Sequence, residues 1–374
     1  MKKINILLWF FYLIIFPFQI NEPGNLQIAD SFLILGLLIN YKMIILKFSS
    51  NVLIELKTFV FYTFLVSLFF SIIFFDIQFF KAPLNYFYCY LVCLLILHFF
   101  GIYNFVNVTL FSILISCLLQ LLLYFRLDTS ESFRISLFFN NPNQLAFYGI
   151  ILNTFLFLLI PLSNYRFKFL LLLFLFLINS FLIILSISQT AIIITTLMFF
   201  YLLYKYVFKS IIVFIFISIF LAYLSINLNI SSDNYSPIQN VLNRIESELD
   251  EGFDGDNGVE GRNYTRLIKF PEYLLFGAGE ARLDRFDKNV NLEIHSVFAN
   301  ILFSYGFFGF LFFILFILKI AIKINFGNLV LFILFLLFTF PHNMLRWPLF
   351  WILMTYFYYL TKKNNYETNQ IYIT

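Results

Sequence analysis

The chain alternates long apolar runs with short polar connections. Each run approaches the ~20 residues that a helix needs to cross the ~30 Å hydrocarbon core of a bilayer. The runs that we read as helices occupy residues 4–20, 25–41, 58–75, 84–103, 105–125, 144–162, 167–186, 189–208, 210–229, 296–318, 327–341 and 345–361. The pattern therefore predicts an all-α, polytopic integral membrane protein with about twelve transmembrane helices.

One polar stretch, residues 230–294, is far longer than the other connections and holds thirteen of the twenty acidic residues. Simple connections between helices are short, so a segment of this length usually has a function. We expect its first half to be flexible and its second half to form short helices at the membrane surface. The chain then divides into helices one to nine (1–229), one large external loop (230–294), and helices ten to twelve with a tail (295–374).

Composition supports the same class. With 61% hydrophobic residues, 57 Phe and a mean hydropathy of +0.90, the chain cannot be a soluble domain with a polar surface. The three cysteines, Cys89, Cys93 and Cys117, all lie in apolar runs and do not form a CxxC pair. Their placement indicates core packing rather than a metal site or a redox pair.

Lysines and arginines fall mostly on opposite sides of the membrane in the predicted topology. When both termini are placed in the cytoplasm, twelve of the fifteen lysines fall on the cytoplasmic side, as the positive-inside rule requires. The first apolar run lacks a small-residue cleavage site, which indicates a retained helix rather than a removed signal peptide. Eight of the nine arginines fall on the opposite side, where the rule does not account for them. Arginine on the external face therefore points to function.

The first external motif runs from Arg134 to Ala146. Asn141 is a good N-cap residue and Pro142 suits the first helical position, so part of the motif is explained as a helix start. That explanation leaves Arg134 and Asn143 unused. A helix N-terminus beside an arginine is also a ready anion site.

The second motif places Arg262 four residues before Arg266, and a glycine-rich turn that ends in Glu280 follows. If this stretch is helical, the two arginines share one face and could grip the two phosphates of a diphosphate. Alternatively, both arginines neutralise the acidic run before them.

Two histidines lie where the chain re-enters the membrane. His295 precedes the tenth helix, and histidine is the usual general base near neutral pH. His342, in Pro341-His342-Asn343 with Arg346 nearby, lies at the outer end of another helix. A single histidine at an interface is more often a satisfied polar residue than a catalyst, and we favour His295 over His342.

The ordered set of motifs resembles the bacterial O-antigen polymerase and O-antigen ligase superfamily, over roughly residues 134–310. The matching pieces are Arg134 with Asn-Pro-Asn-Gln-Leu-Ala, Ser186-Ile-Ser-Gln-Thr-Ala, Gly261-Arg262 followed by Leu-Leu-Phe-Gly-Ala-Gly, and His295 leading into Tyr305-Gly306-Phe-Phe-Gly309. The chain departs from the family in having Gln189 where an arginine is frequent. It also has Arg266 at the distance where the family has a tryptophan.

The resemblance implies an enzyme of the bacterial inner membrane that works on undecaprenyl-diphosphate-linked oligosaccharide at the periplasmic face. We prefer a polymerase, which extends a lipid-linked repeat unit, to a ligase, whose acceptor is lipid A core. A chain-length regulator and a flippase of the same pathway would be its partners.

Diphosphate chemistry assigns the expected roles. Developing negative charge on phosphate is stabilised by arginine, whose planar fork binds two oxygens at once. We expect His295 and Arg262 to be catalytic. The expected diphosphate-binding residues are Arg134, Arg262, Arg266 and Arg285, and the expected supporting residues are Asn143, Glu280 and His342.

Other classes are disfavoured. The Asp254–Gly258 stretch lacks ligands that a calcium loop needs, so we expect neither metal nor cofactor. The sequence has no Walker phosphate loop and no dinucleotide fingerprint, and we expect no nucleic-acid partner. The rival of another class is a flippase for lipid-linked oligosaccharide. The nearly charge-free spans and the single large loop argue against a carrier built from two similar halves.

Overall fold

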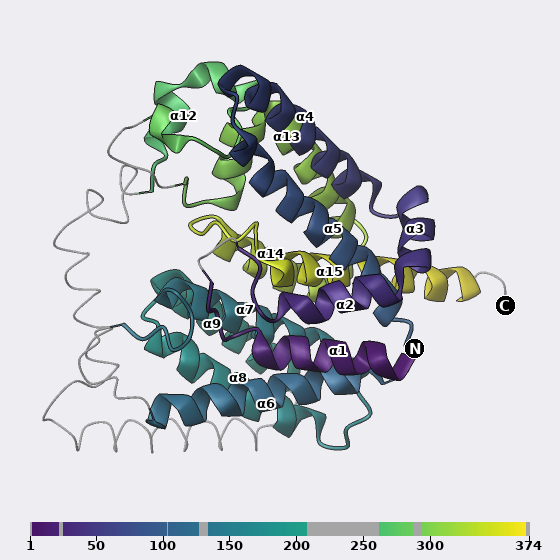
Figure 1. Cartoon of the computed structure of the whole chain (residues 1–374). Coiled ribbons are helices and arrows are strands. Elements are labelled where there is room, and N and C mark those ends of the chain that lie inside the picture. Colours follow the sequence, from purple (N-terminus) through teal and green to yellow (C-terminus); the bar gives the residue numbers. More distant parts are fainter. Residues whose placement is uncertain are drawn as a thin grey trace, which may run out of the picture. The chain divides into compact units, whose positions relative to one another are not determined.

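The computed structural model describes six stretches of the chain and forms no strand within them (Figure 1). The described residues are 2–21, 25–102, 104–126, 134–207, 262–286 and 293–371. A helix occupies eleven of the twelve predicted segments, and the twelfth, 210–229, lies outside the described residues. The all-α prediction is confirmed for this part of the chain.

The chain forms two compact units. Unit 1 comprises Met1–Tyr12, Asn21–Phe105 and Phe253–Thr374, and unit 2 comprises Leu13–Ile20 and Val106–Gly252. This division follows spatial contacts, whereas the predicted division into 1–229, 230–294 and 295–374 follows membrane topology. The division by contacts does not test the division by topology, which stays a prediction.

Unit 1 holds most of the described helices. They are α1 (Lys2–Ile15, whose last residues fall in unit 2), α2 (Asp30–Ile39), α3 (Tyr41–Ser49), α4 (Ile54–Phe74), η1 (Ile77–Phe80), α5 (Lys81–Phe99), α12 (Thr265–Lys269), η5 (Pro271–Leu274), η6 (Leu283–Arg285), α13 (Val297–Ala321), α14 (Phe326–Thr339) and α15 (Pro348–Ile371). The short α12, η5 and η6 confirm the short helices predicted for the second half of the long polar stretch. Its first half lies outside the described residues.

Unit 2 contains the remaining helices. They are α6 (Phe105–Arg126, apart from its first residue), α7 (Pro142–Leu159), η2 (Ile160–Leu162), α8 (Lys168–Leu185), α9 (Gln189–Leu202) and the π-helical turn η3 (Leu203–Val207). α7 packs along α8, and nearly all of its side chains are buried.

Six of the described helices are long and apolar enough to cross a membrane. Four of these segments are single helices, namely α4, α6, α8 and α13, and the other two are Ile77–Phe99 and Pro142–Leu162. The pair α2 and α3 adds a seventh if it counts as one bent span. The apolar helices thus indicate a membrane protein.

The bend between α2 and α3 departs from the single helix predicted for residues 25–41. The two helices meet at Asn40 at an angle of 81°. The Asn40 side chain donates to the Gly36 carbonyl at 2.7 Å, and its amide exchanges two hydrogen bonds with the buried amide of Asn5, at 2.9 and 3.0 Å. A buried amide must be paired, so this exchange holds the bend against α1.

Helices α4 and α13 lie side by side in unit 1 (Figure 1) and run in opposite directions. Near the first turn of α4, Glu55 accepts hydrogen bonds at 2.7 and 2.8 Å from Lys319, which lies near the end of α13. Further along, the ring of Tyr62 packs against Phe312. The two helices therefore contact each other from the first turn of α4 to near its middle.

Helix α13 is broken at Gly306, where the backbone adopts φ 64° and ψ −171°. The Phe307 N–H, which a continuous helix would pair with the carbonyl four residues back, instead donates to the Leu275 carbonyl at 3.1 Å. The carbonyls of Phe303 and Ser304 accept from the N–H groups of Ala278 and Gly279, at 3.0 and 2.8 Å. The glycine-rich turn thus replaces the hydrogen bonds that the break removes.

Glycine is required on both sides of this contact. Gly277 has φ 97°, and a Cβ there would lie 2.4 Å from the Ser304 carbonyl oxygen. A Cβ on Gly306 would lie 2.4 Å from the Leu275 carbonyl oxygen. The two backbones approach too closely for any side chain, which gives a physical reason for both glycine motifs in the sequence.

We expect Gly277→Ala and Gly306→Ala each to lower the melting temperature of the purified protein. The left-handed backbone alone costs an L-residue about 1–2 kcal/mol, and the contact with backbone oxygen adds to it. The control is Gly101→Ala, whose added Cβ would meet nothing closer than the His98 carbonyl at 3.5 Å. Equal melting temperatures for all three variants would contradict this account of the broken helix.

Candidate functional site

Glu280 follows the glycine-rich turn directly and is buried, with a side chain that is 1% exposed. The Tyr86 hydroxyl of α5 donates to its Oε1 at 2.5 Å. Arg346, in the connection between α14 and α15, donates from Nη2 to its Oε2 at 3.0 Å. Burial raises the pKa of Glu280, as does the charge of Glu293, whereas Arg346 lowers it. The turn therefore delivers one carboxyl group to a paired, water-poor position.

Arg346 joins Glu280 to a second carboxylate, Glu293. Its Nη2 also forms a close ion pair with Glu293, whose other oxygen accepts from the Asn343 side chain at 3.1 Å. Although burial lowers the pKa of Arg346, the charges of Glu293 and Glu280 raise it overall. Arg346 is 20% exposed and Glu293 30%, so the cluster extends from a buried carboxyl group toward solvent.

Arg262 and His295 lie beside this cluster. The His295 backbone N–H donates to the Arg262 carbonyl at 3.2 Å, and Arg262 Nη1 donates to the Pro341 carbonyl at 2.7 Å. The Asn263 side chain donates to the Glu293 carbonyl at 3.3 Å. The two residues expected to be catalytic are therefore held together by the backbone, at the start of α13.

The His295 side chain is exposed. Desolvation of the imidazole and the nearby Arg262 guanidinium lower the pKa of His295 below its usual value of about 6.5, and Glu293 opposes them. A lowered pKa leaves the ring neutral at pH 7. The ring can then accept a proton from a group that approaches from solvent.

Arg266 does not share a helical face with Arg262, because α12 begins at Thr265 and Arg262 precedes it. Asn263, between them, has φ 59°, which directs the chain out of a helical path. The Arg266 side chain is buried, and its guanidinium carbon lies 5.9 Å from the ring centroid of Phe286. The helix that a shared face of Arg262 and Arg266 requires is therefore absent, and the binding of diphosphate by these arginines stays a prediction.

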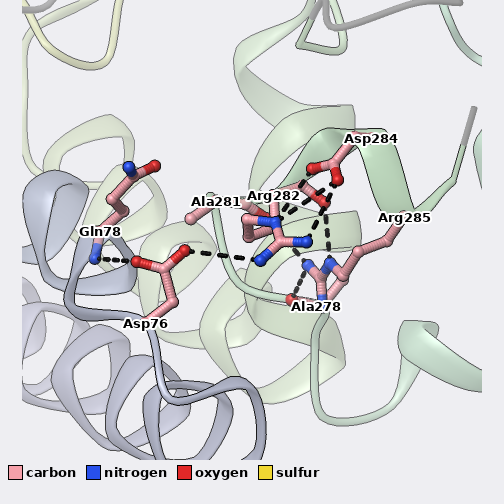
Figure 2. Close-up of polar contacts among 7 residues, drawn as sticks. All are labelled: Asp76, Gln78, Ala278, Ala281, Arg282, Asp284 and Arg285. Atoms are coloured by element: carbon pink, nitrogen blue, oxygen red, sulfur yellow. Dashed lines mark hydrogen bonds and ion pairs between the residues drawn. The ribbon is translucent and has the colours of Figure 1, made fainter. Parts of the chain in front are cut away.

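Arg285 points into its own loop (Figure 2). Its Nη2 donates to the carbonyls of Ala278 and Ala281, at 2.6 and 3.1 Å, and its Nε donates to the carbonyl of Arg282 at 2.9 Å. Four rings lie within 4.7–5.2 Å of the guanidinium carbon, those of Phe70, Phe74, Phe79 and Phe286. Burial lowers the pKa of Arg285 to about 10. These contacts indicate that the Arg285 guanidinium holds its own loop together.

Arg282 occupies the exposed end of the same loop. It forms an ion pair with Asp284 at 3.2 Å and a longer one with Asp76 at 3.8 Å (Figure 2). Asp76 in turn accepts from the Gln78 backbone N–H at 2.9 Å and so caps η1. This arginine links the loop to the end of α4.

Arg134 belongs to unit 2, whereas the residues described above belong to unit 1. It donates from Nη2 to the Asn143 side chain at 2.8 Å and from Nε to the Ser186 carbonyl at 3.0 Å. The predicted cap is present, since the Asn141 side chain accepts from the Gln144 N–H and Pro142 begins α7. Two of the family-like motifs thus meet within unit 2.

His342 is buried and stacks on Phe338, with ring centroids 4.5 Å apart. It lies next to Asn343, which contacts the cluster, and its ring packs against α14. The contacts favour a packing role, consistent with the lower rank that the sequence gave it.

In the sequence, Arg346 stands out only as a neighbour of His342, and neither Glu293 nor Tyr86 was given a role. A tyrosine inside an apolar helix carries no sequence signal of its own. Arg346 did carry one, because the predicted topology places it on the external side, close to a histidine and an asparagine. Among the described residues, no group of three or more His, Cys, Asp or Glu side chains is placed to hold a metal ion, and residues 254–258 lie outside them.

We expect Arg346→Met to destabilise the protein by about 3–5 kcal/mol, because it leaves the buried Glu280 without its cation. Adding Glu280→Gln should recover much of this loss, which chemical denaturation in detergent would measure. Asp284→Asn is the control, since it alters an exposed ion pair and should leave stability close to that of the original chain. A double variant no more stable than Arg346→Met would contradict the pairing.

No family model matches this chain, and no curated protein matches its sequence.

Proposed function

We propose that this protein is a polymerase of O-antigen or another surface polysaccharide in the bacterial inner membrane. Its substrates would be undecaprenyl-diphosphate-linked oligosaccharides, reached from the periplasmic face. The observation that carries the proposal is the backbone hydrogen bond from His295 to Arg262, because it holds an exposed imidazole in the same part of the structure as a cation. The apolar helices support a substrate held in the bilayer.

The proposed reaction needs one base and one cation. A sugar hydroxyl of the acceptor gives its proton to the His295 imidazole, and its oxygen forms a bond with the anomeric carbon of the donor. The bond from that carbon to the diphosphate breaks, and its electron pair leaves on the phosphate oxygen. Arg262 stabilises the developing charge, and the imidazolium later releases its proton to water. Attack opposite the leaving group inverts the anomeric carbon.

The remaining polar residues take supporting roles in this scheme. Arg346 holds Glu293 close to His295, and Glu280 anchors Arg346 from the buried side. Arg285 fixes the loop through carbonyl oxygens, so we assign it to structure rather than to phosphate. Arg266 stays a candidate for the diphosphate, because arginine suits phosphate geometry. Arg134 belongs to the other unit, and its expected contact with the diphosphate stays untested.

The proposal includes a topology of twelve spans with both termini in the cytoplasm and residues 230–294 connected from the periplasmic side. A reporter enzyme that is active only in the periplasm, fused after Ser247, should therefore be active. The same reporter fused after Lys323 should be inactive, because the lysines at the end of α13 mark a cytoplasmic connection. The reverse pattern would remove the basis for an external active site.

We expect Arg262→Ala and His295→Ala to abolish the glycan ladder in cells that lack the original chain, leaving single repeat units on lipid A core. Loss of a general base costs about 10²–10⁴-fold in rate. With purified protein, activity should rise with pH through a midpoint below 6.5, because only the neutral imidazole accepts a proton and its pKa is lowered.

Arg282→Ala is the matched control for this experiment, since it removes an exposed arginine of the same loop and should keep the ladder. A full ladder from both Arg262→Ala and His295→Ala would overturn the mechanism. Loss of every unit from core, with long polymer left on the lipid carrier, would identify a ligase instead. Movement of lipid-linked sugar across the liposome membrane, without lengthening of its glycan, would identify a flippase.

A further inference from the structure

The segment from Tyr273 to Arg282 contacts the two apolar helices α4 and α13. These contacts show which part of each helix the segment lies beside. On α4, the Tyr62 hydroxyl donates to the Phe276 carbonyl at 3.3 Å. Gly279 lies against Phe70 of α4 and Phe79 of η1, and Arg282 reaches Asp76 just beyond the end of α4. The segment therefore rises along α4 from Phe276 toward Arg282.

Helix α13 gives the same order independently. The Leu275 carbonyl accepts from the Phe307 N–H, and the N–H groups of Ala278 and Gly279 donate to the carbonyls of Phe303 and Ser304. Position 307 lies deeper in α13 than positions 303 and 304. Both helices thus place Leu275 and Phe276 at the lowest point of the segment.

That lowest point is close to the middle of both helices. Tyr62 is two residues from the centre of the 21-residue α4, and Phe307 is two residues from the centre of the 25-residue α13. At 1.5 Å per residue, each position is about 3 Å from the helix centre. Asp76, beside Arg282, is twelve residues from the centre of α4, or about 18 Å. The hydrocarbon core extends about 15 Å on either side of its centre.

The surface at the lowest point is apolar and exposed. Leu275 is 51% exposed and Phe276 is 62% exposed, and the ring of Phe276 stacks on Phe308 of α13 at 5.8 Å. The neighbouring face of α4 carries similar exposed side chains, such as Leu65. Exposed phenylalanine and leucine continuous with the outer faces of two candidate spans suit acyl chains rather than water.

Several backbone groups of this segment have the protein partners that hydrocarbon requires. Non-helical backbone at membrane depth is tolerated where its polar groups are satisfied by protein. Here Gly277, Ala278 and Gly279 are buried, and their N–H groups donate to Tyr273, Phe303 and Ser304 carbonyls. The buried Glu280 is paired with Arg346 and Tyr86.

We propose that residues 273–282 form a re-entrant loop that enters the bilayer beside α4 and α13, with Leu275 and Phe276 in contact with lipid acyl chains near the bilayer centre. The loop returns to the side from which it entered, where Arg282 and Asp284 meet water. This inference concerns the membrane and does not depend on the proposed enzyme activity.

Nitroxide labels on single introduced cysteines test it in vesicles of phosphatidylcholine and phosphatidylglycerol. The native Cys89, Cys93 and Cys117 are buried, so the original chain gives the labelling baseline. Labels replace Phe276, the lipid-facing control Leu65 or the water-facing control Asp284. The measured quantity is the ratio of accessibility to oxygen over accessibility to a water-soluble nickel chelate.

We expect Phe276→Cys to match Leu65→Cys and to exceed Asp284→Cys several-fold in this ratio, because oxygen concentrates in hydrocarbon and the chelate does not enter it. A label at Phe276 that the chelate reaches as readily as it reaches Asp284 would mean a water-filled vestibule and would overturn the proposal. A label that neither reagent reaches would also overturn it. If Phe276→Cys fails to fold, Leu275→Cys tests the same point.

Discussion

The break in α13 leaves backbone groups without hydrogen-bond partners in the helix, and another segment of unit 1 has to supply those partners. When Gly306 leaves helical geometry, the Phe307 N–H and the carbonyl groups of Phe303 and Ser304 lose their partners within the helix. An unpaired buried backbone group costs free energy comparable to a lost hydrogen bond, so another backbone must come within about 3 Å. The glycine-rich turn does so, and only residues without a Cβ allow the approach.

Docking of this turn positions the polar cluster. Glu280 comes directly after Gly279, so the hydrogen bonds that hold the turn also set the depth of its carboxyl group. Arg346 then pairs with Glu280 and Glu293, and Glu293 lies two residues from His295. A buried carboxylate is tolerated only with a cation and hydrogen bonds, which explains why tyrosine, arginine and asparagine gather there. The geometry at the exposed end follows from the pairing at the buried end.

Much of the candidate site was visible in the sequence as separate motifs. Asn141 and Pro142 predicted the start of α7 correctly, because capping is local chemistry. The helical face that Arg262 and Arg266 would share does not form, because Asn263 takes a positive φ and α12 begins only at Thr265. Arg285 looked like a phosphate ligand by residue type alone, yet its guanidinium lies among carbonyl oxygens and aromatic rings. The residue type identifies a cation, but the groups that this cation binds depend on which segment of the backbone packs against it.

The sequence by itself determined the helical class, the membrane character and most helix positions, because apolar run length and local capping do not depend on distant residues. It also marked Arg262, His295 and both glycine motifs as unusual. Tertiary structure alone decided that the Gly277–Gly279 turn pairs with the break at Gly306, and that Arg346 holds the carboxylates of Glu280 and Glu293, which are thirteen positions apart in the chain. Contacts between segments far apart in the chain arise from close packing and from the pairing of buried polar groups, and neither is encoded in a local pattern.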